Sequence, residues 1–230
     1  MRQAFFFLLV AVRVGAQDAP LSPFQEQKAR SLLRNQLSCL GCHELRGDGG
    51  RSAPSLTAVA SRRNAAYIRA IIEDPQRVAP GVAMPESRMP STTRELLIRF
   101  FTRGGTTGAS GTVANRVAPT VFKNAQPDAA SLYAHWCASC HGPRGKGDGP
   151  NARYLPVPPA VHASAERMRT RSDDALFDAI AGGGAIMGKS ARMPAFGATL
   201  SSPEIRALVA YIRRLCTCRG PAWSRSDEPR

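Results

Sequence analysis

The sequence is poor in histidine, in acidic residues and in strand-like alternation. Its 230 residues include four histidines, and 17 acidic residues stand against 31 basic ones. Almost no segment alternates polar and apolar residues with a period of two, which argues against a fold built from half-buried strands. Beyond the N-terminal region, no segment holds the ~20 apolar residues that a membrane-spanning helix requires. We therefore expect an all-α protein.

Residues 1–16 have the pattern of a secretory signal peptide. Arg2 precedes an apolar run over residues 4–12, and small residues lead to an expected cleavage site after Ala16. The run is too short to span a bilayer and Arg13 interrupts it, so a retained anchor is the weaker alternative. We expect export to the periplasm, with the mature protein either free or peripheral to the membrane.

Four of the six cysteines form two copies of Cys-x-x-Cys-His, at residues 39–43 and 137–141. Two thiols at this spacing can each add to one vinyl group of a porphyrin, and the following histidine can ligate its iron. A zinc ribbon usually brings its cysteine pairs within about 15–20 residues, and a redox dithiol needs a preceding strand. The motifs therefore predict two covalently bound haem c groups, attached through the residues Cys39, Cys42, Cys137 and Cys140, with the iron ligands His43 and His141.

The pattern around the motif repeats once and predicts two small helical domains, residues 22–103 and 127–216, each organised around one haem. Residues 104–126 form a linker rich in small residues, and residues 217–230 form a C-terminal tail. In each copy a capped helix leads into the motif, a glycine-rich loop follows, and a middle and a closing helix come after it. The expected helix signals are Ser22-Pro23-Phe24-Gln25, Asp128, the segments 64–74 and 173–181, and the capping boxes Thr92-x-x-Glu95 and Ser201-x-x-Glu204.

Two methionines are predicted to be the distal iron ligands. Met84-Pro85 lies eight residues before Thr92, and Met193-Pro194 lies eight residues before Ser201, so the two registers agree. The rivals are Met89, which also precedes a proline, and Met187, which does not.

The scarcity of histidine limits other ligand sets. His135 and His162 are the histidines outside the motifs, and both belong to the second domain. Ligation of the first haem by two histidines would therefore need a residue from the other domain. We expect His135 to lie at the surface or at a haem edge, and His162 to be a loop residue rather than a ligand.

Residues from about 22 to 216 resemble a bacterial two-haem cytochrome c with two class I domains in tandem. The resemblance rests on both Cys-x-x-Cys-His motifs, the stretch from Asp74-Pro75 to Met84-Pro85, residues 192–197 and the closing helices. It implies that a proline carbonyl accepts a hydrogen bond from the proximal histidine in each domain. Pro54 matches this role in the first domain. In the second, Pro158 is preferred to the neighbouring prolines Pro156 and Pro159.

The sequence Cys216-Thr217-Cys218 departs from that family pattern. A third haem is excluded because no histidine follows. A direct disulfide would close a tight ring and is not favoured. The other interpretations are a bridge to another chain, a distal ligand in place of methionine, an exposed thiol pair and simple tail cysteines.

The positive charge bears on the partners. Without Arg2 and Arg13 the chain carries 29 basic and 17 acidic residues, a formal +12, which four haem propionates would lower to about +8. In an exported haem protein this balance favours an acidic redox partner or an anionic membrane surface over nucleic acid.

Two functions of different class are consistent with these features. The first is single-electron transfer, as a shuttle or as the cytochrome subunit of a respiratory or dehydrogenase complex. The alternative is a two-haem enzyme such as a peroxidase or a thiosulfate dehydrogenase, in which one iron opens to bind substrate. Because both domains contain a Met-Pro pair, we expect a carrier and no enzymatic activity.

Overall fold

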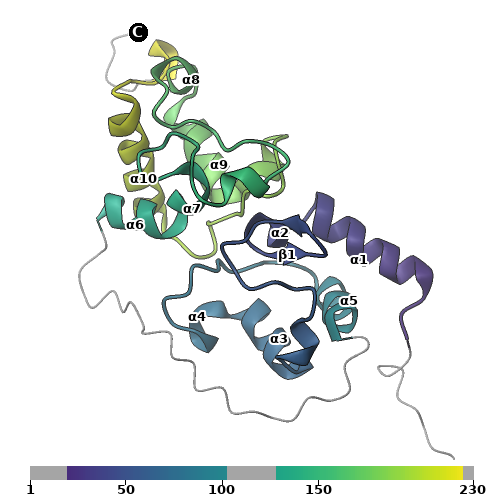
Figure 1. Cartoon of the computed structure of the whole chain (residues 1–230). Helices are drawn as coiled ribbons and strands as arrows, with labels where there is room; N and C mark the ends of the chain where they lie inside the picture. Colours follow the sequence, from purple (N-terminus) through teal and green to yellow (C-terminus); the bar gives the residue numbers. More distant parts are fainter. Residues whose placement is uncertain (1–19, 103–127, 225–230) are drawn as a thin grey trace, which may run out of the picture.

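The computed structural model describes residues 20–102 and 128–224, whose regular secondary structure is almost entirely helical (Figure 1). The expected signal peptide and linker, and the end of the tail, lie outside the described residues. An all-α fold was predicted from the lack of strand-like alternation, and it is confirmed. No helix within the described ranges is long and apolar enough to cross a membrane.

The first part of the chain folds around the first motif. Its elements are α1 (Pro23–Asn35), α2 (Cys39–Cys42), β1 (Glu44–Leu45), β2 (Asp48–Gly49), the 3-10 helix η1 (Val59–Ser61), α3 (Ala65–Glu73), α4 (Pro75–Val78) and α5 (Ser91–Thr102). The antiparallel pair β1 and β2 is a short hairpin directly after the motif, and it was not predicted.

The second part repeats the plan without a hairpin among its described residues. Its elements are α6 (Ala129–Trp136), α7 (Ala138–His141), η2 (Ala152–Tyr154), α8 (Ala165–Met168), α9 (Asp173–Ile186), α10 (Ser202–Cys216) and η3 (Ala222–Ser224). Figure 1 shows α2 and its hairpin at the side of the first domain that meets the second.

Local hydrogen bonds explain where the helices begin. The Ser22 hydroxyl accepts from the Gln25 N–H and the Gln25 side chain accepts from the Ser22 N–H, which forms the predicted capping box. Asp128 caps α6 through the N–H groups of Ala130 and Ser131. The predicted box at the start of α10 is also present.

Two predicted boundaries differ from the structure. The helix α5 begins at Ser91 rather than at a Thr92 capping box, because the Glu95 carboxylate pairs with Arg69 of α3 instead. The helix α9 was expected to stop at the three glycines, yet it runs to Ile186 with a break at Gly183 (φ 78°). A Cβ at Gly183 would lie 2.8 Å from the Ala195 nitrogen, so the break lets the loop after Met193 pass close to the helix.

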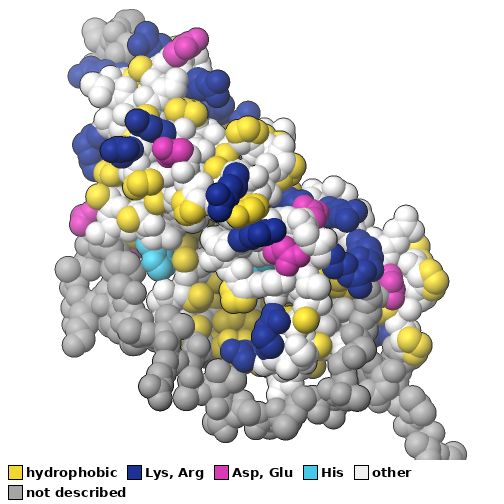
Figure 2. Space-filling model, in the orientation of Figure 1, with side chains coloured by type: hydrophobic (Ala, Val, Ile, Leu, Met, Phe, Trp, Pro, Cys, Tyr) yellow, Lys and Arg dark blue, Asp and Glu magenta, His cyan; other side chains and the backbone are white. Residues whose placement is uncertain are grey.

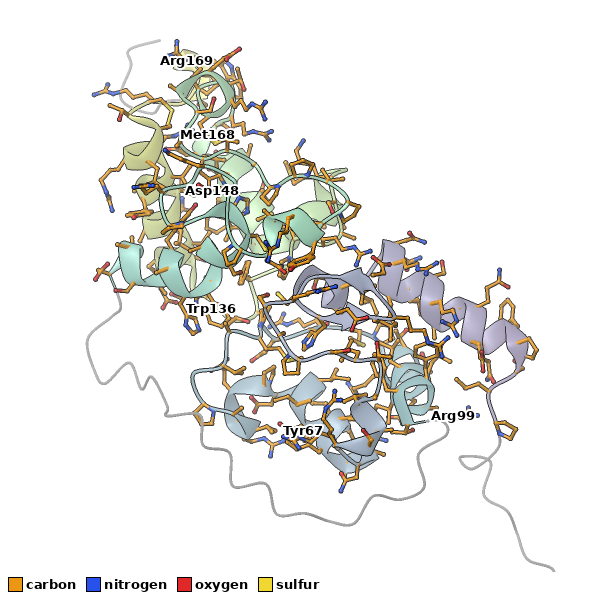
Figure 3. The ribbon with its side chains drawn as sticks, in the orientation of Figure 1. Tyr67, Arg99, Trp136, Asp148, Met168 and Arg169 are labelled. Carbon is orange, nitrogen blue, oxygen red and sulfur yellow. A yellow bond between two sulfur atoms is a disulfide. The ribbon has the colours of Figure 1, made fainter. Side chains whose placement is uncertain are left out.

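Each domain has its own apolar core. The first domain has one cluster centred on Leu33, Leu40 and Leu97 and a smaller one on Ile68, Ile72 and Ile98. The second domain has a single larger cluster, in which α10 packs on α6 and α9. Trp136 lies at the side of that domain nearest the first (Figure 3), and its ring meets that of Phe196 edge to face.

Candidate haem sites

The first motif forms a single helical turn. Cys39 and Cys42 begin and end α2, neither is in a disulfide, and the His43 N–H donates to the Cys39 carbonyl at 2.9 Å. The His43 Nδ1–H donates to the Pro54 carbonyl oxygen at 2.7 Å. The hydrogen bond that the resemblance implied for Pro54 is therefore present.

Glu44 holds the loop that carries Pro54. Its carboxylate accepts hydrogen bonds from the Gly47 N–H and from the hydroxyls of Ser55 and Thr57. These bonds, first of all that from Gly47, hold the pKa of Glu44 below its ordinary value. Sequence reasoning missed this residue, although a carboxylate directly after the motif histidine was a visible signal.

In the second domain the acceptor is Ala160, so the prediction of Pro158 is wrong. The His141 Nδ1–H donates to the Ala160 carbonyl at 2.9 Å, whereas Pro158 is exposed. The physical reason is the path of the loop after the rigid prolines. The loop returns to the glycine-rich segment at Ala163, whose N–H donates to the Gly145 carbonyl at 2.9 Å.

His162 lies against the proximal side of the second site. It is a loop residue, as predicted, but it is only 8% exposed. Its ring is nearly parallel to that of His141, and its Nδ1 is 3.0 Å from the Tyr133 hydroxyl. Burial, and secondarily the neighbouring His141, lowers the pKa of His162 well below its ordinary value. His162 thus supports the predicted proximal ligand instead of facing it across an iron.

The residues of both motifs fit haem attachment. Burial raises the pKa of Cys39 to about 11 and that of Cys137 to about 12, surroundings that suit neutral thioethers better than thiolates. Burial also lowers the pKa values of His43 and His141, which keeps both rings neutral. Because each Nδ1 donates to a carbonyl, each Nε2 carries the lone pair that an iron needs.

A zinc site finds no support in the described part of the chain. No group of three or more His, Cys, Asp or Glu side chains is arranged there to hold a metal ion. A structural zinc site needs four such ligands, usually with thiolates among them.

The predicted distal methionines lie in half-buried loops. The Met84 carbonyl accepts from the Gln76 side chain at 3.4 Å, and the Met193 carbonyl accepts from the Gly184 N–H at 3.1 Å. Met89 instead packs on both apolar clusters of the first domain. Met187 forms the C-cap of α9. The assignment of Met84 and Met193 as ligands stays a prediction.

Cys216 and Cys218 form a disulfide, the interpretation that was possible but not favoured because of its tight ring. The reason is the left-handed conformation of Thr217 (φ 48°), which ends α10 and brings the two Cα atoms to 5.1 Å. The bond leaves neither sulfur available as an iron ligand.

Comparison with known protein families agrees with this geometry. Residues 28–98 match the family model described as cytochrome c, and residues 124–212 match that of cytochrome C oxidase, cbb3-type, subunit III. Each match includes one Cys-x-x-Cys-His motif. No curated protein and no solved structure matches the chain. Cytochrome c domains carry covalently bound haem c and transfer electrons. The chain therefore contains two cytochrome c domains in tandem.

Proposed function

We propose that the chain is an exported two-haem cytochrome c that passes single electrons between redox partners in the periplasm. The observation that carries the proposal is present in both domains. His43 is half-buried and His141 is buried, burial lowers the pKa of both, and each Nδ1 is hydrogen-bonded to a backbone carbonyl, at 2.7 Å for His43 and 2.9 Å for His141. One such site in each domain supports two haems per chain.

The protein would hold each haem through its own motif. Cys39 and Cys42 would supply the thioethers in the first domain, and Cys137 and Cys140 those in the second. When bound, haem iron supplies a one-electron Fe(II)/Fe(III) couple. The carbonyls of Pro54 and Ala160 fix the histidine rings and increase their basicity.

The proposed sixth ligands favour a carrier. With Met84 and Met193 on the two irons, neither iron has an open position for a substrate. The Gln76 and Gly184 bonds to the two methionine carbonyls hold the loops in place. We therefore propose electron transfer without enzymatic turnover.

The charge of the chain supports an acidic partner. The first domain has 13 basic and 7 acidic residues, and Figure 2 shows Lys and Arg side chains over both domains with few acidic ones between them. The family match of the second domain is to a subunit of an oxidase, which supports a place in a membrane-associated respiratory complex as well as a free shuttle.

An optical redox titration of the purified mature protein tests the proposal. We expect two reversible one-electron transitions, and no turnover of peroxide or thiosulfate above that of free haem. Steady turnover of either substrate that fails on substitution of one distal methionine would contradict a carrier.

A further inference from the structure

Asn151 is a polar side chain buried between the two domains, with 2% of its surface exposed. Its Nδ2–H donates to the Gly41 carbonyl at 2.6 Å, and its Oδ1 accepts from the Arg51 N–H at 2.6 Å. These partners lie 110 and 100 residues away in the sequence. One side chain of the second domain thus satisfies two backbone groups of the first.

The same amide also touches the second motif. Asn151 Nδ2 lies 3.4 Å from the Cys140 sulfur. Since Gly41 immediately precedes Cys42, Asn151 sits between the second cysteine of one motif and that of the other.

A second polar contact crosses the interface beside Asn151. Arg192 is 8% exposed, and its Nη2 lies 3.0 Å from the Asp48 carboxylate, which also meets Arg34 at 3.4 Å. The backbones of the two domains approach closely at Gly41, where an added Cβ would collide with the Arg192 carbonyl. A charged pair at β2 and a tight backbone contact at α2 therefore hold the first motif and its hairpin against Arg192 of the second domain.

Both Met-Pro segments adjoin this interface. Arg192 directly precedes Met193, and the Glu86 N–H, one residue after Pro85, donates to the Thr199 hydroxyl at 2.9 Å. The first domain therefore contacts the second through both its motif turn, at Gly41, and its methionine loop, at Glu86. The second domain contributes Arg192, next to its own predicted methionine ligand.

We propose that Asn151 is a positioning residue that locks the two haem-attachment turns together, so that the domains form one electron-transfer unit rather than two independent cytochromes. This inference rests on the proposed function, since it needs a haem at each motif. A buried amide is costly unless both its donor and its acceptor are satisfied, so it favours a single arrangement of the domains. Haems held at Cys42 and Cys140, the cysteines on either side of Asn151, would then keep a constant separation.

The test uses Asn151→Leu, which keeps the size of the side chain and removes both hydrogen bonds. The holoprotein is partly reduced by a rapid pulse, and electron exchange between the two haems is followed optically. We expect the exchange rate to fall at least about tenfold, because small displacements of reacting groups have large effects on rate. Hydrogen exchange of the Arg51 amide should become faster in the same variant.

Matched charge variants distinguish an effect of the domain interface on electron exchange from an effect of lower overall stability. Asp48→Asn weakens the pair that crosses the domains, and Glu73→Gln weakens the 3.1 Å pair with Arg94 inside the first domain. We expect slower exchange between haems in Asp48→Asn and wild-type exchange in Glu73→Gln.

Haem content distinguishes the outcomes. Two haems per chain with wild-type exchange rates in both Asn151→Leu and Asp48→Asn would overturn this inference and leave the proposed function intact. A wild-type protein with fewer than two haems would overturn both.

Discussion

The imidazole of His162 lies flat against that of His141, with ring centroids 4.1 Å apart and 13° between the planes. The Tyr133 hydroxyl is hydrogen-bonded to His162 Nδ1 at 3.0 Å and so holds the ring that stacks on His141, the predicted proximal ligand of the second site. In the described part of the chain, no ring stacks on His43 in the same way. The two sites are therefore unequal.

His162→Leu should destabilise the second domain and alter one haem only. Loss of the ring leaves the buried Tyr133 hydroxyl without its partner, which should cost about 1–3 kcal/mol in the free energy of unfolding. We expect the midpoint potential of one haem to shift while that of the other stays constant, as measured by redox titration and urea unfolding. His162→Phe should restore part of the stability through the stack. Equal shifts of both potentials would contradict a local role.

Met84→Ala and Met89→Ala should have different effects. Oxidised protein with methionine on both irons has a weak long-wavelength sulfur-to-iron absorption band, and Met84→Ala should remove half of it. Met89→Ala should keep the full band and lower the unfolding free energy by about 2 kcal/mol, because Met89 packs in the apolar clusters. The opposite pattern would identify Met89 as the ligand.

Acid should weaken the contact between α3 and α5. The hydrogen bonds from Arg69 hold the pKa of Glu95 below its ordinary value. The contribution of this carboxylate is thus complete above its unfolded-state pKa and is lost as the pH falls through its folded-state pKa. Glu95 is partly exposed, so Glu95→Gln should cost no more than about 1 kcal/mol at neutral pH and nothing in strong acid. Urea unfolding across this range measures the difference, with the exposed Glu166→Gln as a control; an equal loss in both variants would argue against the pair.

Electron transfer to an acidic partner should slow as salt rises. Exposed charges are screened over about 10 Å at 0.1 M ionic strength, so steering by the basic surface should fade. Stopped-flow rates measured at increasing salt test this expectation. A rate independent of salt would remove the docking argument without affecting the haem assignment.

Helix starts were predictable because their signals are local. Ser22, Asp128 and Ser201 each cap a helix within three residues, so a short sequence window contains the whole hydrogen-bond pattern. The two Cys-x-x-Cys-His motifs were recognisable for the same reason, since each lies within five consecutive residues.

The contacts that were not predicted depend on the path that the folded backbone takes in space. Ala160 rather than Pro158 meets His141 because of the path of a loop, and the Cys216–Cys218 bond depends on the left-handed conformation of Thr217. Asn151 meets backbone groups more than 90 residues away, and no short sequence pattern predicts a hydrogen bond between residues so far apart.

The most direct test of this account is the number of covalent haems per chain. A pyridine haemochrome assay of the purified mature protein should give two. Cys39→Ala and Cys140→Ala should each prevent normal attachment in the affected domain alone and make that half sensitive to protease, because each small domain folds around its haem. One haem or none in the wild-type protein, or protease resistance of the haem-free half, would contradict two haem-centred domains.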